Sequence, residues 1–249
     1  IEIDRFIKHL LSNVYFVVIE TRAGLSKTLQ IFDAINTTGL DLNGGDIFKI
    51  KIYEYLRDKK QKNETAFDEI SGLYEKIDNY NDELGYHFMG IQEVLHIYQY
   101  ILIARHNLPV TLYNYGTDTF FERLFDTVFN ITQWEHFKGK AASVELSLED
   151  IERIIQVRYE YERNWYQTAE DCCSYYLIMW SRYSRYWILI IIFLFQFRDE
   201  ADPTNNLFVF TKQLTKLFTI FSIRFLKGIN NMHSFVHSFN KVLQDHLCP

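Results

Sequence analysis

From about residue 24 to the end of the chain, apolar residues recur at helical spacing with very few interruptions. The 249 residues include only 10 Gly and 3 Pro, and the prolines stand at positions 109, 203 and 249. Glycine and proline are the strongest local breakers of regular structure, so long stretches without them favour helices. A hydrophobic content of 48% is typical of a folded protein. The sequence therefore predicts a mainly α-helical protein, with a helical bundle over most of its length.

The expected helices follow from this spacing and from start and stop residues. The first two are marked by apolar residues at helical spacing: Leu29, Phe32, Ala34 and Ile35, then Ile47, Ile50, Tyr53 and Leu56. Further helices are expected at residues 63–80, 86–106, 117–137, 147–168, 170–182, 184–198, 205–227 and 232–246. Ser147, with an acid three residues later, predicts a helix start, whereas residues 107–109 and Gly139 predict stops.

A single strand is expected at residues 13–20, because the letters NVYFVVIE are mostly β-branched and aromatic. One strand cannot satisfy its own backbone hydrogen bonds, so we expect residues that precede the sequence to complete its sheet. The charged segment RDKKQKNE at 57–64 lacks apolar periodicity and predicts a boundary near residue 60. Residues 1–60 would then be a small, incomplete α/β remnant of one strand and two helices, and residues 61–249 an all-helical domain.

The run YWILIIIFLFQF at 186–197 is the one membrane-like segment of the sequence. A membrane-spanning helix needs about 20 apolar residues, so this run predicts a buried core helix instead. No signal-peptide pattern is present, and the three cysteines (Cys172, Cys173 and Cys248) fit neither a disulfide framework nor a zinc site. A cytoplasmic location is the expectation that follows, and no membrane partner is expected.

The turn between the first two helices carries more polar and glycine residues than a helix connection needs. These residues are Asn36, Gly39, Asp41, Asn43, Gly44, Gly45 and Asp46. In a functional interpretation, Gly44 and Gly45 expose N–H groups at a helix start, which is a natural anion site, with Lys49 one turn further on. In a structural interpretation, the segment is a helix–turn–helix connection with Asp46 as the N-cap. The sequence leaves both open.

The same stretch resembles a signature of the GmrSD-type family of bacterial defence proteins, whose N-terminal domain is ParB-like and sulfiredoxin-like. The matching order is Phe32-Asp33-Ala34-Ile35-Asn36-Thr37-Thr38-Gly39-Leu40-Asp41-Leu42, followed by Asp46-Ile47-Phe48-Lys49. The run LTKLFTIFSIRFL at 214–226, which contains Arg224, resembles a late helix of the same family. Only residues 27–56 carry a specific resemblance.

The resemblance implies a larger intact protein that senses modified or foreign DNA and couples nucleotide hydrolysis to DNA cleavage. The family's Asp-Gly-Gln-Gln-Arg motif and its His-Asn-His nuclease core are both absent from this sequence. We therefore expect a fragment without a catalytic site of its own, whose partners are a missing N-terminal domain and a nuclease domain. The implied cofactors, a nucleoside triphosphate and a divalent metal, belong to the intact protein. The residues expected near the nucleotide or phosphate are Asn36, Gly39, Asp46 and Lys49.

DNA is an expected partner, because lysine and arginine contacts to phosphates dominate nucleic-acid affinity. The expected contact residues are Lys51, Arg57, Lys59, Lys60, Arg182 and Arg185. The alternative for the lysine-rich helix end is a solvated face that complements the helix dipole, and a net charge of −6 argues against a broad basic surface. One basic groove formed by Lys49, Lys51 and Lys60 with Arg182 and Arg185 would favour DNA binding. Acids at 149, 150 and 152 that interrupt the groove would favour the rival hypothesis, a helical protein–protein interaction module.

Two further patterns are weaker. His233 and His237 have the i, i+4 spacing of zinc peptidases, but Ser234 stands where those enzymes place the catalytic Glu, so no metal site is expected. The aromatic segment 158–187 has the composition of a stacking pocket for a base or of a helix–helix interface. In the rival hypothesis it is the face that docks a partner. No phosphate-binding loop or nucleophile elbow is visible.

Overall fold

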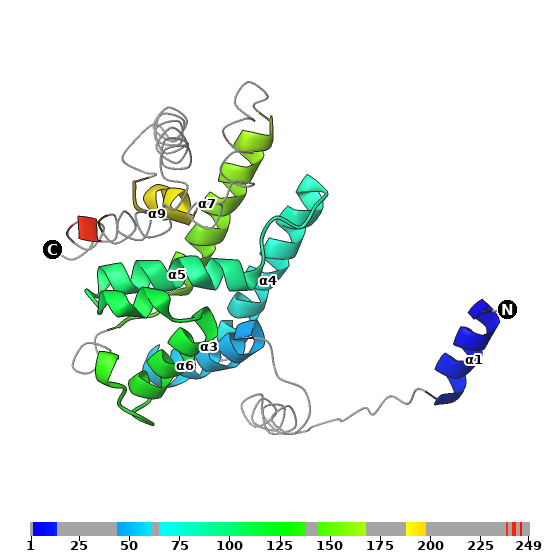
Figure 1. Ribbon diagram of the computed structural model, residues 1–249, viewed down its shortest axis with the longest axis horizontal. Coiled ribbons are helices and arrows are strands. Elements are labelled where there is room, and N and C mark those ends of the chain that lie inside the picture. Colours follow the sequence, from blue (N-terminus) through cyan, green and yellow to red (C-terminus); the bar gives the residue numbers. More distant parts are fainter. Residues whose placement is uncertain are drawn as a thin grey trace, which may run out of the picture. The chain divides into compact units, whose positions relative to one another are not determined.

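The computed structural model describes residues 2–13, 44–60, 65–137, 144–167 and 188–197, with residues 238, 241, 242 and 245. Seven α-helices and two short 3-10 helices, and no strand, lie in this described part. Their bounds are α1 (Glu2–Asn13), α3 (Gly44–Lys60), α4 (Thr65–Leu84), α5 (Ile91–Arg105), η1 (Val110–Asn114), α6 (Thr117–Val128), η2 (Glu135–Phe137), α7 (Leu148–Gln167) and α9 (Ile188–Phe197). The mainly α-helical fold predicted from the sequence is confirmed (Figure 1).

The chain divides into two compact units, residues 1–42 and residues 43–249. In the first unit the structure describes only α1, whose residues Ile3, Phe6, Ile7, Leu10 and Leu11 form an exposed apolar face. The predicted strand at 13–20 starts at Asn13, which ends this helix, and its other residues lie outside the described part. The predicted helix at 29–35 lies outside it as well.

Helix α3 belongs to the second unit and packs against α4, α5 and α6. The predicted boundary near residue 60 would have separated α3 from these helices, whereas the observed division falls between Leu42 and Asn43. Because helices surround α3, it buries more than the predicted stripe: Phe48, Ile52 and Tyr55 are buried as well. A helix that is apolar on most sides is a core helix rather than a surface helix.

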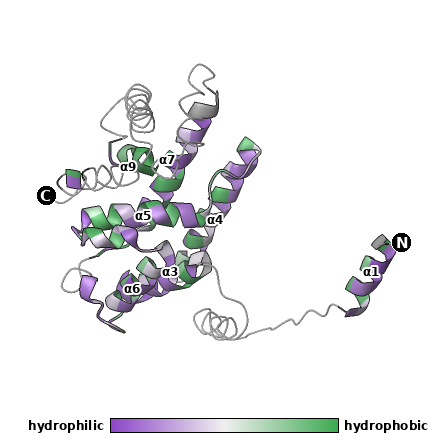
Figure 2. Cartoon of the chain, in the orientation of Figure 1, coloured by the Kyte–Doolittle hydropathy of each residue, from purple (hydrophilic) through white to green (hydrophobic). Residues whose placement is uncertain are grey.

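The apolar centre of the second unit lies where α5, α7 and α9 meet. Residues 188–192 of α9 are all buried, and α9 is coloured hydrophobic over most of its visible surface in Figure 2. The run at 186–197 is therefore a core helix, as predicted, at least over its described residues. None of the described helices combines the length and the apolar character needed to cross a membrane.

Helices α4 and α7 run parallel and in register, and their contact is polar. Three hydrogen-bonded pairs between the two helices, and a fourth made by Tyr86 just after the end of α4, share a constant separation of 76 residues along the chain. They are Lys76–Glu152, Tyr80–Gln156, Glu83–Tyr159 and Tyr86–Glu162. The rings of Tyr80 and Tyr159 also stack, with centroids 3.8 Å apart. A constant offset is possible only if both elements advance in the same direction at the same rise per residue.

Most predicted helices are present, with shifted ends. The segments 47–56, 63–80, 147–168 and 184–198 correspond to α3, α4, α7 and α9. Ser147 caps α7 as predicted, because its Oγ accepts a hydrogen bond from Asp150 N at 3.3 Å. Those predicted at 170–182 and 205–227 lie outside the described residues, as does nearly all of the one at 232–246.

Two predicted helices are shorter than expected. The helix expected at 86–106 begins only at Ile91, because Asn81 holds the preceding loop: its Oδ1 accepts hydrogen bonds from Phe88 N and Met89 N. The helix expected at 117–137 ends at Val128, because Asn130 adopts a left-handed conformation with φ 59°.

Candidate functional site at the first turn of α3

The first turn of α3 contains the second half of the family-like signature, and three other helices contribute side chains to it. Helix α3 begins at Gly44, so Asp46 lies inside the first turn rather than at the N-cap position. Gly45 is buried and Gly44 half-buried. The hydroxyl of Tyr74 in α4 donates a hydrogen bond to Gly45 O at 2.6 Å.

Gln92 of α5 occupies the N-terminal end of α3. With its amide oxygen facing α3, Oε1 accepts hydrogen bonds from Gly45 N at 2.7 Å and Gly44 N at 3.2 Å, and Nε2 donates to Asp118 Oδ1 at 3.2 Å. The opposite orientation would set donor against donor and acceptor against acceptor, so the neighbours determine the orientation. Two N–H groups that an α-helix leaves without an intrahelical partner are thereby satisfied.

Asp118 of α6 explains why position 44 is a glycine. A Cβ atom on Gly44 would lie 1.5 Å from Asp118 Oδ1 and 2.1 Å from its Cγ. Positive φ is not the reason, because Gly85 is the only glycine with positive φ within the described residues. The requirement is therefore space for the carboxylate that holds Gln92.

Lys49 lies between two aromatic rings. Its Nζ is 5.0 Å from the ring centroid of Phe67 and 5.0 Å from that of Tyr74. Cation–π contacts of this kind hold an ammonium group against the protein surface. The N–H groups of Gly44 and Gly45 are thus bonded to Gln92, and the ammonium of Lys49 lies against two rings of the same chain. Asn36 and Gly39, the other residues expected near a nucleotide, lie outside the described part.

Three of the four described basic residues that were expected to contact DNA (Lys51, Arg57 and Lys60) are paired with acids. Lys51 lies 3.4 Å from Glu54, and Arg57 lies 2.6 Å from Asp58. The hydrogen bond from Arg57 lowers the pKa of Asp58 below its ordinary value. Lys59 is exposed, whereas Arg182 and Arg185 lie outside the described residues.

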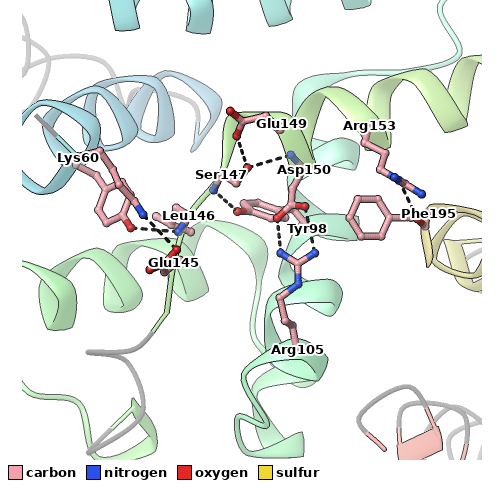
Figure 3. Close-up of polar contacts among 11 residues, drawn as sticks. Lys60, Tyr98, Arg105, Glu145, Leu146, Ser147, Glu149, Asp150, Arg153 and Phe195 are labelled. Atoms are coloured by element: carbon pink, nitrogen blue, oxygen red, sulfur yellow. Dashed lines mark hydrogen bonds and ion pairs between the residues drawn. The ribbon is translucent and has the colours of Figure 1, made fainter. Parts of the chain in front are cut away.

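Figure 3 shows how the acidic segment before α7 meets the end of α3. Glu145 forms an ion pair with Lys60 at 3.2 Å, and this hydrogen bond raises the pKa of the Lys60 ammonium. The next residues are held through the backbone: Leu146 N donates to Tyr55 OH, and Ser147 N donates to Tyr98 OH at 2.9 Å.

The acids of α7 also have partners on neighbouring helices. Asp150 forms a bidentate ion pair with Arg105 of α5 (Figure 3). Glu152 forms an ion pair with Lys76 of α4. Arg105 and Lys76 are not among the residues expected to contact DNA. Because Arg182 and Arg185 lie outside the described residues, the basic groove that would favour DNA binding stays a prediction.

A buried charged centre at the junction of α5 and α7 has no counterpart among the predicted site residues. Arg158 is 1% exposed and donates to Glu93 Oε1 at 2.8 Å, to Glu162 Oε2 at 2.5 Å and to Phe88 O at 3.0 Å. Tyr86 donates to the other oxygen of Glu162 at 2.6 Å. Burial would lower the pKa of Arg158, but Glu93 and Glu162 raise it above its ordinary value.

The centre sets one guanidinium against two carboxylates. Burial raises the pKa of Glu93, although Arg158 acts in the opposite direction. A shallow hollow of about 560 Å³ lies at the loop beside this centre, lined by Asp78, Asn81, Asp82, Gly85, Tyr86 and His87. Within the described residues no group of three or more His, Cys, Asp or Glu side chains is arranged to hold a metal ion. The predicted pattern His233 and His237 lies outside those residues.

Sequence reasoning missed Gln92, Asp118 and the centre around Arg158. Only the pair Arg158 and Glu162 had a visible signal, its i, i+4 spacing on a helix. Comparison of the chain with protein-family models, with curated proteins and with solved structures gave no match.

Proposed function

We propose that the chain is the central part of a GmrSD-type DNA-defence protein, in which the helical body couples a nucleotide-hydrolysing domain to DNA recognition or cleavage. The family-like order of residues 32–49 supports this proposal. In the proposal the chain is not catalytic by itself. The nucleotide and a divalent metal bind the upstream domain of the intact protein, which acts in the cytoplasm.

The observation that carries the proposal is the attachment of the signature to the helical body. Gly44 and Gly45, which directly precede the signature residues 46–49, contact side chains from α4, α5 and α6. A displacement of the signature must therefore move these helices or break the contacts at Gly44 and Gly45. An element that transmits nucleotide-dependent motion needs such an attachment.

The test is a matched pair of glycine substitutions in the intact protein. Gly44→Ala places a methyl group on Asp118 and forces that carboxylate away from Gln92. We expect nucleotide hydrolysis to be retained and DNA cleavage to fall by at least about tenfold, within the range of coupling between sites. The control is Gly72→Ala in α4, where an added Cβ meets no atom within 4 Å. The control is expected to keep both activities.

Two results would contradict the proposal. One is a reading frame that lacks an Asp-Gly-Gln-Gln-Arg motif upstream of Ile1, together with an intact protein that hydrolyses no nucleoside triphosphate. The other is Gly44→Ala protein with the same hydrolysis and cleavage rates as Gly72→Ala protein.

The second candidate function is a helical protein–protein interaction module without nucleotide or nucleic acid. The pairing of Lys51, Arg57 and Lys60 with acids favours it, because paired cations give little net attraction for phosphates. The same reading-frame and hydrolysis measurements distinguish it, since an interaction module needs neither the upstream motif nor the activity.

A further inference from the structure

We propose that Gln92 of α5 caps the N-terminus of α3 and that Asp118 of α6 positions the Gln92 side chain. The first turn of α3 is then held in place by these side chains and is not an anion site. The inference does not depend on the proposed function. It concerns how the glycine-rich end of the turn works, whatever the N-terminal unit does.

The capping role of Gln92 follows from matching the free N–H donors at the start of α3 with an acceptor. The first N–H groups of an α-helix point out of its end, where a side chain, water or an anion must accept them. Here one amide oxygen, Gln92 Oε1, accepts from both Gly44 and Gly45. A side chain of the same helix usually provides the cap, whereas this one comes from α5.

The positioning role of Asp118 follows from the remaining amide hydrogens. A free glutamine side chain has several rotatable bonds, and ordering it has an entropic cost. Asp118 Oδ1 accepts from Gln92 Nε2 at 3.2 Å, which selects the amide orientation that faces α3. The lack of a Cβ at Gly44 leaves room for that carboxylate. The cap therefore requires all three residues: Gln92 as acceptor, Asp118 to orient it and Gly44 to leave room for Asp118.

The carbonyl oxygen of Gly45 also accepts a hydrogen bond from a side chain of another helix. Tyr74 donates to Gly45 O at 2.6 Å, so side chains from both α4 and α5 bond the backbone of the first turn. A variant that loses the Gln92 contact keeps the Tyr74 contact. The exchange rates of the Gly44 and Gly45 amides can therefore rise without unfolding of the helical body.

The experiment is amide hydrogen exchange of Gly44 and Gly45, followed by NMR in the full 249-residue chain. In the unmodified protein both amides should exchange more slowly than unprotected glycines. Gln92→Ala should raise their exchange rates about fivefold, the effect of losing one hydrogen bond of ordinary strength. Gln133→Ala, which removes an exposed glutamine of the 129–134 turn, is the matched control and should leave both rates unchanged.

A rescue experiment separates positioning from packing. Gln92→Glu retains an acceptor for the two N–H groups but places a carboxylate against Asp118, so exchange should rise as in Gln92→Ala. Adding Asp118→Asn to Gln92→Glu swaps amide and carboxylate and should restore protection, because the amide can then donate to the acid. Failure of this double variant to restore protection would overturn the role of Asp118.

Titration of the unmodified chain with inorganic phosphate tests the exclusion of anions. The resonances of Gly44 and Gly45 should not shift. Saturable shifts at these two residues, or exchange of their amides at the unprotected rate, would overturn the proposal even if the variants do not fold.

Discussion

At the scale of single residues, Arg158 is a charged side chain that the described chain buries almost completely. The guanidinium is buried and directs hydrogen bonds to two carboxylates and a backbone carbonyl. The guanidinium carbon of Arg158 (Cζ) also lies 5.0 Å from the ring centroid of Phe88. A buried ion pair adds little net stability, but removing one partner leaves an uncompensated charge.

Arg158→Leu should therefore lower the free energy of unfolding by about 3–5 kcal/mol, since the buried Glu162 and the half-buried Glu93 would lose their counter-charge. The control is Arg163→Leu, at an exposed position five residues further along α7. This substitution should change the free energy of unfolding by less than about 0.5 kcal/mol. Urea denaturation followed by circular dichroism measures both. Equal effects of the two substitutions would contradict the importance of the buried centre.

At the scale of elements, three helices end with the same backbone arrangement. Gly85, Asn107 and Asn130 follow α4, α5 and α6, and each has positive φ. In each case the next N–H bonds the carbonyl five residues back: Tyr86 to Asn81, Leu108 to Ile103, and Ile131 to Asp126. This is the Schellman motif, in which a left-handed residue closes the free carbonyls of the helix end.

The motif makes opposite predictions for two substitutions at Asn130. Asn130→Ala should destabilise the fold by about 1 kcal/mol, because alanine in the left-handed region loses about 1–2 kcal/mol. Asn130→Gly should be neutral or stabilising, because glycine adopts positive φ without strain. Thermal denaturation compares the midpoint temperatures of the two variants with that of the unmodified chain. A more stable Asn130→Ala than Asn130→Gly would rule out the left-handed end.

At the scale of the whole molecule, charge is distributed unevenly over the second unit. The last turn of α3 is basic, with Arg57, Lys59 and Lys60, and two of these three side chains form ion pairs. Four of the exposed acids of α4, Asp68, Glu75, Asp78 and Asp82, lie on one helix face. Together with the net charge of −6, this distribution opposes a phosphate backbone.

The 249-residue chain alone should consequently bind a random DNA duplex weakly, with Kd above about 10⁻⁴ M at physiological salt, the weak end of non-specific binding. Replacing Lys59 and Lys60 by Ala should change Kd by less than about twofold, because one of the two lysines is already paired. Fluorescence anisotropy over a salt series measures both quantities. Submicromolar affinity that falls steeply with salt would instead assign DNA contact to this chain.

The first turn of α3 shows how far local patterns reach. The sequence indicated that Gly44 and Gly45 were unusual, and it left an anion site and a structural turn as alternatives. It had no means of finding Gln92 or Asp118, because nothing in the local spacing of α5 or α6 relates those residues to a turn far upstream. Their meeting depends on the packing of four helices.

The sequence by itself determined the helical fold of the described part of the second unit, the stop at Asn107, the cap at Ser147 and the burial of residues 188–192. These features depend on residues within a few positions of one another, where helical periodicity and capping act. Only the tertiary structure decided that α3 belongs to the body, that α4 and α7 run in register, and that acids pair with the basic end of α3. Those outcomes depend on the relative placement of helices, which local spacing does not encode.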